Sequence, residues 1–525
     1  MIESLLHHWR SPHKFPGGVH PPQHKAESNK LASIKAKIPA RLILPLHQHI
    51  GEPAEPVVAI GDTVLKGQRI AKANGYVSAA IHAPTSGTVT DIANYPIPHP
   101  SGMNAPCIII ETDGEDKWGQ RNAVQDWKKL DASALRNVIR DAGIVGLGGA
   151  GFPSFIKLNP GANKQIDTLI LNGVECEPYI TCDDVIMRER SGEIMLGLTI
   201  MRHALNAKEC VIAVEENKPQ ALAAMTMMAK ETSGVKVVSV PTIYPHGSEK
   251  QLIQAITGKE VPVNGLATQI GIVCHNVATA AAVYRAVYQG EPLISRYVTI
   301  TGSGVTKPRN IRAFIGTPMS ELVKQCDGDF SAISRLIMGG PMMGYAMQTD
   351  QVPVIKTTNC IIACTEEDVV SEPAVMPCIR CGACAEVCPV SLLPQQLYWH
   401  AKSRNHEKAQ EFDLFDCIEC GCCSYVCPSK IPLVQYYRHA KGEIWAAERE
   451  KQQADIARDR HEFRQARIER EAAEKAERHR QKKAALAAKK KATDTVIKTG
   501  DSETKSVIDE AVAKAKAKRL QQGSL

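Results

Sequence analysis

Eight cysteines between residues 378 and 427 form two copies of one spacing. The first copy reads Cys378-Ile-Arg-Cys381-Gly-Ala-Cys384-Ala-Glu-Val-Cys388-Pro, and the second reads Cys417-Ile-Glu-Cys420-Gly-Cys-Cys423-Ser-Tyr-Val-Cys427-Pro. In such a C-x2-C-x2-C-x3-C-P run, three closely spaced thiolates bind one iron–sulfur cluster and the fourth binds the other cluster. The pattern therefore predicts two [4Fe-4S] clusters, one bound by Cys378, Cys381, Cys384 and Cys427, and the other by Cys417, Cys420, Cys423 and Cys388.

Other uses of cysteine fit this spacing less well. Zinc sites use C-x2-C pairs without a third cysteine and a trailing Cys-Pro. A disulfide framework is typical of short chains in an oxidising compartment, and this chain has 525 residues. Cys422, inside the second run, is expected to pack beside the cluster rather than to bind it.

A second site with the potential for chemistry is a glycine-rich loop. Gly146-Leu-Gly148-Gly149-Ala-Gly151 formally matches G-x-G-x-x-G, which indicates dinucleotide binding only when it follows a strand and opens a helix. Here a predicted helix with Asp131 as its N-cap precedes the loop, so the Rossmann interpretation is rejected. Closely spaced glycines still let backbone amides approach a flat or phosphorylated ligand.

Composition places these sites in a multidomain chain. The length predicts several domains, and no leader pattern or apolar run of membrane-spanning length is present. We therefore expect a cytoplasmic protein whose membrane association runs through partners. The net charge of +7 belongs to the tail from Lys441 to Leu525, which has 22 Lys+Arg against 15 Asp+Glu. The rest of the chain is neutral.

The pattern of short strands, helices and turns predicts a multidomain α/β architecture. Residues 37–115 resemble the flattened β-barrel of lipoyl and biotinyl carriers, through Gly61-Asp-Thr-Val-Leu-Lys-Gly-Gln and Ala83-Pro-Thr-Ser-Gly-Thr-Val, without an evident modified lysine. The other predicted parts are a Pro/Gly-rich arm without regular structure at 1–36, an open α/β domain at 120–290, a small β-rich module with one helix at 295–347, an acidic linker at 366–377, a two-cluster ferredoxin-like domain at 366–440, and a charged tail at 441–525 that forms a solvated helix fraying to disorder.

Four blocks resemble the flavoprotein subunit of respiratory complex I. They are Gly146-Leu-Gly-Gly-Ala-Gly-Phe-Pro-Ser-Phe-Ile-Lys157, Asn172-Gly-Val-Glu-Cys-Glu-Pro, Tyr244-Pro-His-Gly-Ser-Glu249 and His275-Asn-Val-Ala-Thr279. The chain departs from that family at Leu147, where the family has Arg, and at Ser248, where it has Glu. With the Gly17-Gly-Val-His-Pro arm and the doubled cysteine run, residues 10–440 resemble the C subunit of the Rnf (Rsx) electron transport complex.

This resemblance implies an FMN-containing α/β domain, a β-grasp (SLBB-like) module at 295–347 and NADH as the substrate. A flavin takes a hydride and releases electrons singly, so it can link NADH to one-electron clusters. The implied cofactor-binding residues are Gly146, Gly148, Gly149, Gly151, Lys157, Asn172, Glu175, Gly247 and Asn276, with Phe152, Glu177, Tyr244 and Glu249 on the nicotinamide side.

The implied protein is a peripheral subunit on the cytoplasmic face of the bacterial inner membrane. Its partners would be integral-membrane and iron–sulfur subunits and a ferredoxin-type acceptor, with no nucleic acid. Alternatives that stay open are a cobalamin reductase with the same modules, a complex I flavoprotein subunit, an electron-wiring scaffold without NADH activity, and a nucleic-acid role for the basic tail.

Overall fold

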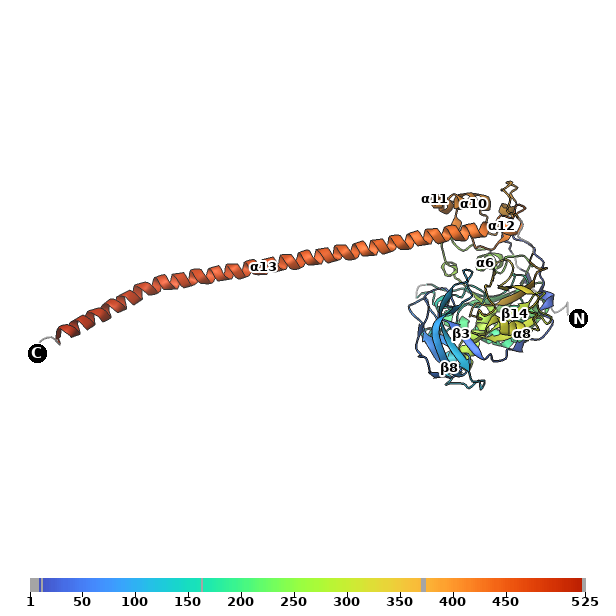
Figure 1. Ribbon diagram of the computed structural model, residues 1–525, viewed down its shortest axis with the longest axis horizontal. Helices are drawn as coiled ribbons and strands as arrows, with labels where there is room; N and C mark the ends of the chain where they lie inside the picture. The colour runs from blue at the N-terminus through green and yellow to red at the C-terminus, as the bar shows by residue number, and fades with distance from the viewer. Residues whose placement is uncertain (1–8, 11–12, 162–163, 370–373, 522–525) are drawn as a thin grey trace. The chain divides into compact units, whose positions relative to one another are not determined.

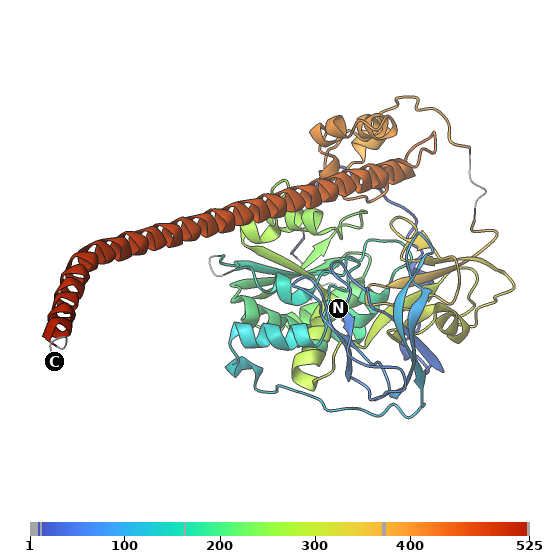
Figure 2. The ribbon, with the colours of Figure 1, turned by 60° about the vertical axis from the view of Figure 1, so that its left-hand side comes forward.

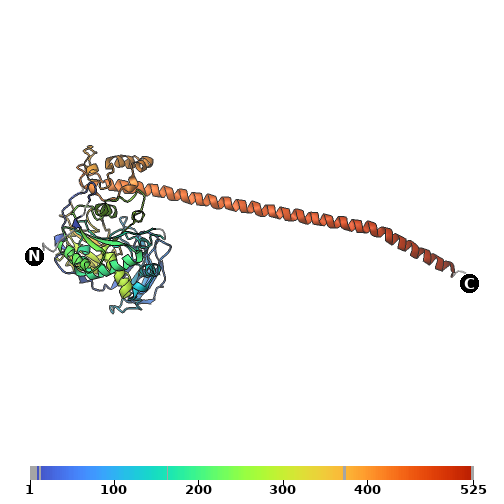
Figure 3. The same ribbon diagram turned by 180° about the vertical axis from the view of Figure 1, so that it is seen from behind.

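The computed structural model describes residues 9–10, 13–161, 164–369 and 374–521. The chain has two compact units, Met1–Lys441 and Gly442–Leu525. Figures 1, 2 and 3 show it from three directions.

The barrel region consists of two small antiparallel sheets, seen in blue in Figure 1. The order of one sheet is β3-β9-β8-β5 and that of the other is β4-β6-β7. The strands are β3 (Arg41–Pro45), β4 (Glu55–Pro56), β5 (Thr63–Val64), β6 (Arg69–Lys72), β7 (Ile81–His82), β8 (Gly87–Pro96) and β9 (Asn104–Thr112). Leu42 and Leu44 of β3 belong to the same buried cluster as Leu169 and Leu171 of the next domain, so the barrel and that domain share a core.

The α/β domain has a wholly parallel sheet with the strand order β1-β12-β11-β10-β13. Its strands are β1 (Trp9–Arg10), β10 (Thr168–Gly173), β11 (Glu209–Glu215), β12 (Val235–Val240) and β13 (Ile272–Asn276). Its helices are α1 (Ala132–Asp141), α2 (Ser154–Lys157), α3 (Cys182–Glu189), α4 (Ser191–Leu205), α5 (Pro219–Lys230), α6 (Glu249–Thr257) and α7 (Val277–Gln289), with the 3-10 turns η3 (Trp127–Lys129) and η4 (Ala267–Ile270). The predicted open α/β arrangement is confirmed.

Both faces of this parallel sheet are buried, as its apolar strands require. Leu169 and Leu171 of β10 face the core that contains α1, α4, α5 and α7. Ile170, between them, faces a second core that contains α6 and also Cys420 and Cys422. The cysteine-rich segment therefore packs against the same domain as the glycine loop.

The arm at 1–36 was predicted to lack regular structure, and this prediction was wrong for part of it. Strand β1 extends the parallel sheet beside β12, the turn η2 covers Lys25–Glu27, and β2 (Ile34–Lys35) pairs with β15. The strands that pair with β1 and β2 lie more than 200 residues later in the chain. The local content of proline and glycine does not reveal such distant pairing. Residues 1–8 and 11–12 lie outside the described residues.

A mixed sheet follows, with the order β17-β16-β18-β14-β15-β2. It contains β14 (Ser295–Thr301), β15 (Arg309–Phe314), β16 (Ile333–Met338), β17 (Tyr345–Ala346), β18 (Cys360–Thr365) and the helix α8 (Met319–Gln325). Strand β18 lies between β14 and β16, parallel to the first and antiparallel to the second. The predicted boundary at residue 347 is therefore too early, because a central strand comes after it.

The cysteine-rich segment is built from short helices: α9 (Ala383–Glu386), α10 (Pro394–Lys402), α11 (His406–Glu411), η5 (Leu414–Asp416) and α12 (Cys422–Tyr425). Its two cysteine runs have the same backbone. Gly382 and Gly421 both have φ of 84°, and Arg380 and Glu419 both have φ of 57°. The repeat seen in the sequence is thus a structural repeat. Residues 370–373 of the predicted linker lie outside the described residues.

Helix α13 (Leu433–Gln521) leaves the first unit and makes up the second. In the second unit nearly all described side chains are exposed, and ion pairs such as Arg458–Asp455 and Arg467–Glu471 join residues three or four apart. The predicted solvated helix is confirmed, but it continues to Gln521 where disorder was expected, since Ala, Glu, Lys and Arg all favour helix. None of the described helices has an apolar stretch sufficient to cross a membrane.

Candidate functional site

The glycine loop connects α1 to α2, so it follows a helix, as the sequence predicts. The Asp131 carboxylate caps α1 by accepting from the Ala134 N–H. Gly146 N–H donates to the Phe152 carbonyl at 2.8 Å, which closes the loop. Gly149 lines the adjoining cavity with φ of 129°, and a Cβ built on it would have nothing within 4 Å. The loop presents bare backbone to a ligand.

All thirteen predicted cofactor-binding residues line one cavity of about 640 Å³. This volume is within the range typical of cofactor sites. The residues are Gly146, Gly148, Gly149, Gly151, Phe152, Lys157, Asn172, Glu175, Glu177, Tyr244, Gly247, Glu249 and Asn276. Because of its size and its glycine wall, this cavity, called the flavin cavity below, fits a flat, phosphorylated cofactor.

Two asparagines at the carboxyl ends of adjacent parallel strands shape the cavity. Asn172 on β10 and Asn276 on β13 lie in register, at the sheet edge where open α/β proteins bind ligands. The Asn172 amide donates to the Gly247 carbonyl at 2.7 Å. Asn276 caps α7 with its side-chain oxygen and donates to the Asp183 carboxylate at 2.6 Å. Both side chains therefore position their neighbours.

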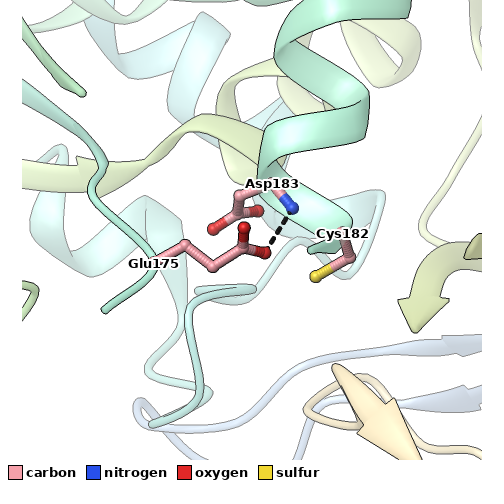
Figure 4. Close-up of side chains that lie close together, drawn as sticks. All are labelled: Glu175, Cys182 and Asp183. Atoms are coloured by element: carbon pink, nitrogen blue, oxygen red, sulfur yellow. Dashed lines mark hydrogen bonds between the residues drawn. The ribbon is translucent and has the colours of Figure 1, made fainter. Parts of the chain in front are cut away.

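A group of three side chains, of which the sequence predicted only Glu175, lines the cavity (Figure 4). Glu175, Cys182 and Asp183 place their functional atoms within 4.8 Å of one another. Glu175 accepts from the Asp183 N–H at 2.6 Å. Burial, with the charge of Asp183, raises the pKa of Glu175 to about 8, and burial raises that of Asp183 to about 6. Burial also holds the pKa of Cys182 well above its usual value, so this thiol is protonated at neutral pH.

The N-terminal arm supplies a buried lysine beneath this acidic loop. Lys25 Nζ donates to the carbonyl oxygens of Glu175 and Glu177 at 2.8 Å and of Ile180 at 2.7 Å. Burial, and then the charge of Lys218, lower the pKa of Lys25. Three carbonyls around one ammonium fix the loop that carries the acidic residues. No local spacing marks Lys25 in the sequence, so it was missed.

Two charged residues predicted for the site have defined partners. Lys157 Nζ donates to Glu249 Oε2 at 2.6 Å and to the Cys274 carbonyl at 2.8 Å. Glu177 accepts from the backbone N–H groups of Met342 and Met343 at 2.7 and 3.0 Å, and burial raises its pKa. The strands of the mixed sheet thus bring the loop after β16 onto the cavity, which the sequence did not predict.

The family's arginine position holds Leu147, which is buried. Its carbonyl accepts from a guanidinium N–H of Arg296 at 3.1 Å. Arg296, on β14, is itself buried. Burial lowers the pKa of its guanidinium, and the charge of Asp183 opposes this lowering. A guanidinium therefore reaches the glycine loop from another domain. Ser248, the other departure, is the N-cap residue of α6.

The eight predicted cluster cysteines line two separate cavities in the predicted groups of four. One cavity is lined by Cys378, Cys381, Cys384 and Cys427, and the other by Cys388, Cys417, Cys420 and Cys423. The exchange of the fourth cysteine between the runs is thus present in the fold. Four thiols around each space are the donor set that a [4Fe-4S] cluster needs. Cys422 also borders the second cavity and is buried.

The second cysteine cavity adjoins the flavin cavity. Cys420 lines both of them. The Tyr244 hydroxyl, which also borders the flavin cavity, donates to the Cys420 carbonyl at 2.6 Å. Of the eight cysteines, Cys420 alone among the described residues borders both spaces, and the first cysteine cavity shares no residue with the flavin cavity. The order of the three spaces is therefore flavin cavity, second cysteine cavity, first cysteine cavity.

Residues Gly17–Val19, called the strap below, join the α/β domain to the cysteine-rich segment. Gly18 N–H donates to the Val387 carbonyl at 3.0 Å. Val19 and Tyr244 exchange backbone hydrogen bonds at 2.8 and 2.9 Å. A Cβ on Gly17 would lie 2.5 Å from the Val387 carbonyl group, so only glycine fits there. The strap thus joins Tyr244, which lines the flavin cavity, to Val387, the residue before Cys388.

Three family models match consecutive parts of the chain. An RnfC barrel sandwich hybrid domain matches residues 13–115, a Nuo51 FMN-binding domain matches residues 139–285, and a 4Fe-4S dicluster domain matches residues 377–431. These domains coincide with the barrel region, the flavin cavity's domain and the cysteine-rich segment. They bear out the predicted barrel, FMN-binding and iron–sulfur domains.

Curated relatives extend the match over most of the chain. A protein of Serratia proteamaculans is 45% identical over 472 residues, which is 90% of this chain and 67% of that protein. Its name makes it the C subunit of an ion-translocating oxidoreductase complex. This chain belongs to that family. The RnfC-type proteins of Pseudomonas aeruginosa and Vibrio cholerae are each 47% identical to it and carry the same name.

This chain spans about three fifths of the length of several of its relatives. It covers 59% of the Pseudomonas aeruginosa protein and 60% of the Vibrio cholerae protein, while 87% and 89% of this chain is aligned. Among solved structures, an NAD+-reducing [NiFe]-hydrogenase in the H2-reduced state matches with a TM-score of 0.44 and 19% identity. That match covers 61% of this chain and 63% of the hydrogenase chain. A likeness of this size decides nothing about function.

Proposed function

We propose that this RnfC-type subunit oxidises NADH and passes electrons one at a time, through FMN and two [4Fe-4S] clusters, to partner subunits. The observation that carries the proposal is the position of Cys420, which lines both the flavin cavity and the second cysteine cavity. A cluster ligand in the wall of a flavin site is what a short electron path requires.

The residues of the flavin cavity divide into two proposed groups. Gly146, Gly148, Gly149, Gly151 and Lys157 would hold FMN, together with Asn172, Glu175, Gly247 and Asn276. The glycines offer backbone N–H groups, and Lys157 offers a positive charge whose carboxylate partner is Glu249. Phe152, Glu177, Tyr244 and Glu249 would shape the nicotinamide side.

When bound, FMN supplies the conversion of a hydride into single electrons, which the clusters accept. The chain's own residues bind and orient these groups. Glu175, whose pKa is raised to about 8, keeps its proton at neutral pH in the cavity wall. Tyr244 and the strap fix the wall that carries Cys420. The proposed cluster ligands are the two groups of four cysteines described above.

The mixed sheet supports the assignment of a β-grasp module. Its four main strands lie side by side in the order β15-β14-β18-β16, which in chain order is second, first, fourth, third. Helix α8 follows β15 in the chain. Its role here is positioning, since its Arg296 donates a hydrogen bond to the glycine loop and its loop after β16 lines the flavin cavity.

The names of the relatives support a place in a membrane complex. We assign this chain to the cytoplasmic face of the bacterial inner membrane as a peripheral subunit of an ion-translocating oxidoreductase complex. Its electron acceptors would be iron–sulfur and integral-membrane subunits, in a reaction of the NADH:ferredoxin type.

Reconstitution with FMN, iron and sulfide under anaerobic conditions tests this function. Adding NADH should bleach the flavin absorbance and then the cluster absorbance. Intact clusters with a bound flavin that NADH does not bleach would leave only the scaffold interpretation. A Gly149→Ala variant should bind less flavin, because its methyl group enters the cavity. Gly61→Ala, also at a positive φ with open space around it but in the barrel region, is the matched control.

A further inference from the structure

A further cavity, of about 210 Å³, lies among the arm, the barrel region and the mixed sheet. Four cations line it, together with two aromatic rings and one carboxylate. These residues are Lys35, Lys66, Arg121, Arg312, Trp118, Phe314 and Glu291. No residue that lines this basic cavity also lines the flavin cavity or either cysteine cavity.

The charges around the basic cavity do not balance. Lys35 and Lys66 share a single carboxylate oxygen of Asp116, at 3.2 and 2.8 Å. Arg312 pairs with Glu291. Within the described part of the chain, Arg121 pairs with no carboxylate. Four cations thus face two carboxylates, which leaves two positive charges in excess.

One of these four cations lies away from water. The Lys66 side chain is 7% exposed, and burial lowers its pKa despite the hydrogen bond that it donates to Asp116. Like charges gathered around one space repel each other, and the repulsion is stronger where water is excluded. An anion inside the cavity would remove this repulsion.

The aromatic rings compensate only part of this charge. Lys66 Nζ lies 4.7 Å from the centre of the Trp118 ring and 5.4 Å from that of Phe314. The Arg121 guanidinium lies 3.8 Å from the Trp118 ring. A cation over an aromatic face is attracted by the ring, but the ring carries no net negative charge. A guanidinium lying on an aromatic face also keeps its N–H groups available to an oxyanion.

We propose that the basic cavity binds a phosphate group, supplied either by a small soluble phosphate compound or by a phospholipid headgroup. Two guanidinium groups and two ammonium groups line this space of about 210 Å³. That space takes a phosphate together with a small attached group. Such a ligand would link β2, the barrel region and β15, which each contribute cations to the cavity.

Binding to the full-length chain tests the soluble source. We expect saturable binding of glycerol 3-phosphate in physiological salt by calorimetry, with a rise in melting temperature. Arg121→Gln should weaken this binding at least about tenfold, as should Lys66→Met. The matched control Lys72→Met removes one barrel-region charge that pairs with Glu55 away from the cavity, and it should leave binding unchanged.

Co-sedimentation with phosphatidylglycerol vesicles tests the lipid source. Vesicle binding that Arg121→Gln abolishes and Lys72→Met preserves would assign the site to a headgroup. Because Arg121 is exposed, its glutamine variant should fold even where Lys66→Met does not. The proposal is overturned where neither ligand source binds. It is also overturned where the Arg121 and Lys72 variants lose binding equally, since that loss would report only net charge.

Discussion

The Tyr244 hydroxyl donates a hydrogen bond of 2.6 Å to the backbone carbonyl of Cys420. Tyr244 lines the flavin cavity, and Cys420 lines both that cavity and the second cysteine cavity. Both residues are buried. One hydrogen bond therefore joins the wall of the proposed flavin site to the loop that would hold the nearer cluster.

Tyr244→Phe should loosen this cluster loop. The substitution leaves a buried carbonyl without its donor, which costs about 1–3 kcal/mol. We expect faster loss of cluster absorbance in the presence of an iron chelator, with flavin binding retained. The matched control is Tyr345→Phe, because the Tyr345 hydroxyl makes a bond of the same length to the Pro98 carbonyl, away from the cysteines. Equal rates in the two variants would contradict the prediction.

The exchange of cysteines between the two runs can be tested by substitution. Cys388→Ser should remove the same EPR signal as Cys420→Ser, although Cys388 belongs to the other run. Cys381→Ser should remove the second signal instead. Iron analysis should show that each variant loses about half of the iron, since each run completes a different cluster. Cys422→Ser should retain all of the iron, and a loss there would make Cys422 a ligand.

The cysteine and glycine motifs were predictable because their chemistry depends on residues close together in the chain. Cys378, Cys381 and Cys384 lie within one turn-rich loop, and only the exchanged fourth ligand comes from the other run. Lys25 was not predictable, because its carbonyl partners lie about 150 residues later.

The same distinction explains the errors in the fold. The open α/β domain at 120–290 was predicted, since apolar runs in a parallel sheet are visible locally. The arm strands β1 and β2 were missed because each exists only by pairing with a distant strand. Arg296 and Asp183 come close to the site only in the folded protein, and no pattern of sequence spacing relates them to the glycine loop.

Lys157→Met should weaken FMN binding. The substitution removes a cation from the cavity wall and leaves Glu249 without its partner at 2.6 Å, so a phosphorylated ligand meets net negative charge. We expect the dissociation constant to rise about tenfold or more, measured by quenching of FMN fluorescence during reconstitution. Lys208→Met, which breaks an exposed pair with Asp167, is the matched control and should bind FMN normally.

Glu175→Gln should flatten the dependence of stability on pH. The folded protein raises the pKa of Glu175 from 4.5 to about 8, so the neutral form favours folding. The stability from this group is complete below about 4.5 and is lost as the pH rises through about 8. Glutamine stays neutral at every pH. The free energy of unfolding of the variant, relative to that of the native protein, should therefore rise by at least about 1 kcal/mol between pH 5 and pH 8.

Chemical unfolding at several pH values measures this difference. Comparing the variant with the native protein at each pH cancels the titrating groups that do not interact with Glu175, among them Lys356, whose pKa burial lowers to about 7. Glu231→Gln, at an exposed residue, serves as the control and should follow the native curve. A constant difference across the pH range would mean that Glu175 does not titrate there.

Gly17→Ala should detach the strap from the cysteine-rich segment. Gly17 has φ of 64°, and an added Cβ would lie 2.5 Å from the carbonyl carbon and oxygen of Val387. The backbone must move, which breaks the 3.0 Å bond from the Gly18 N–H to the Val387 carbonyl. Hydrogen exchange should therefore accelerate at Gly18 and in the neighbouring cysteine loops, even in the protein without cofactors. Gly114→Ala is the control for backbone strain without a clash. Gly114 has φ of 74°, and a Cβ added there would have nothing within 4 Å. Faster exchange at Gly18 only in the Gly17 variant would show that the close contact holds the strap, whereas no change there would show that the strap is held elsewhere.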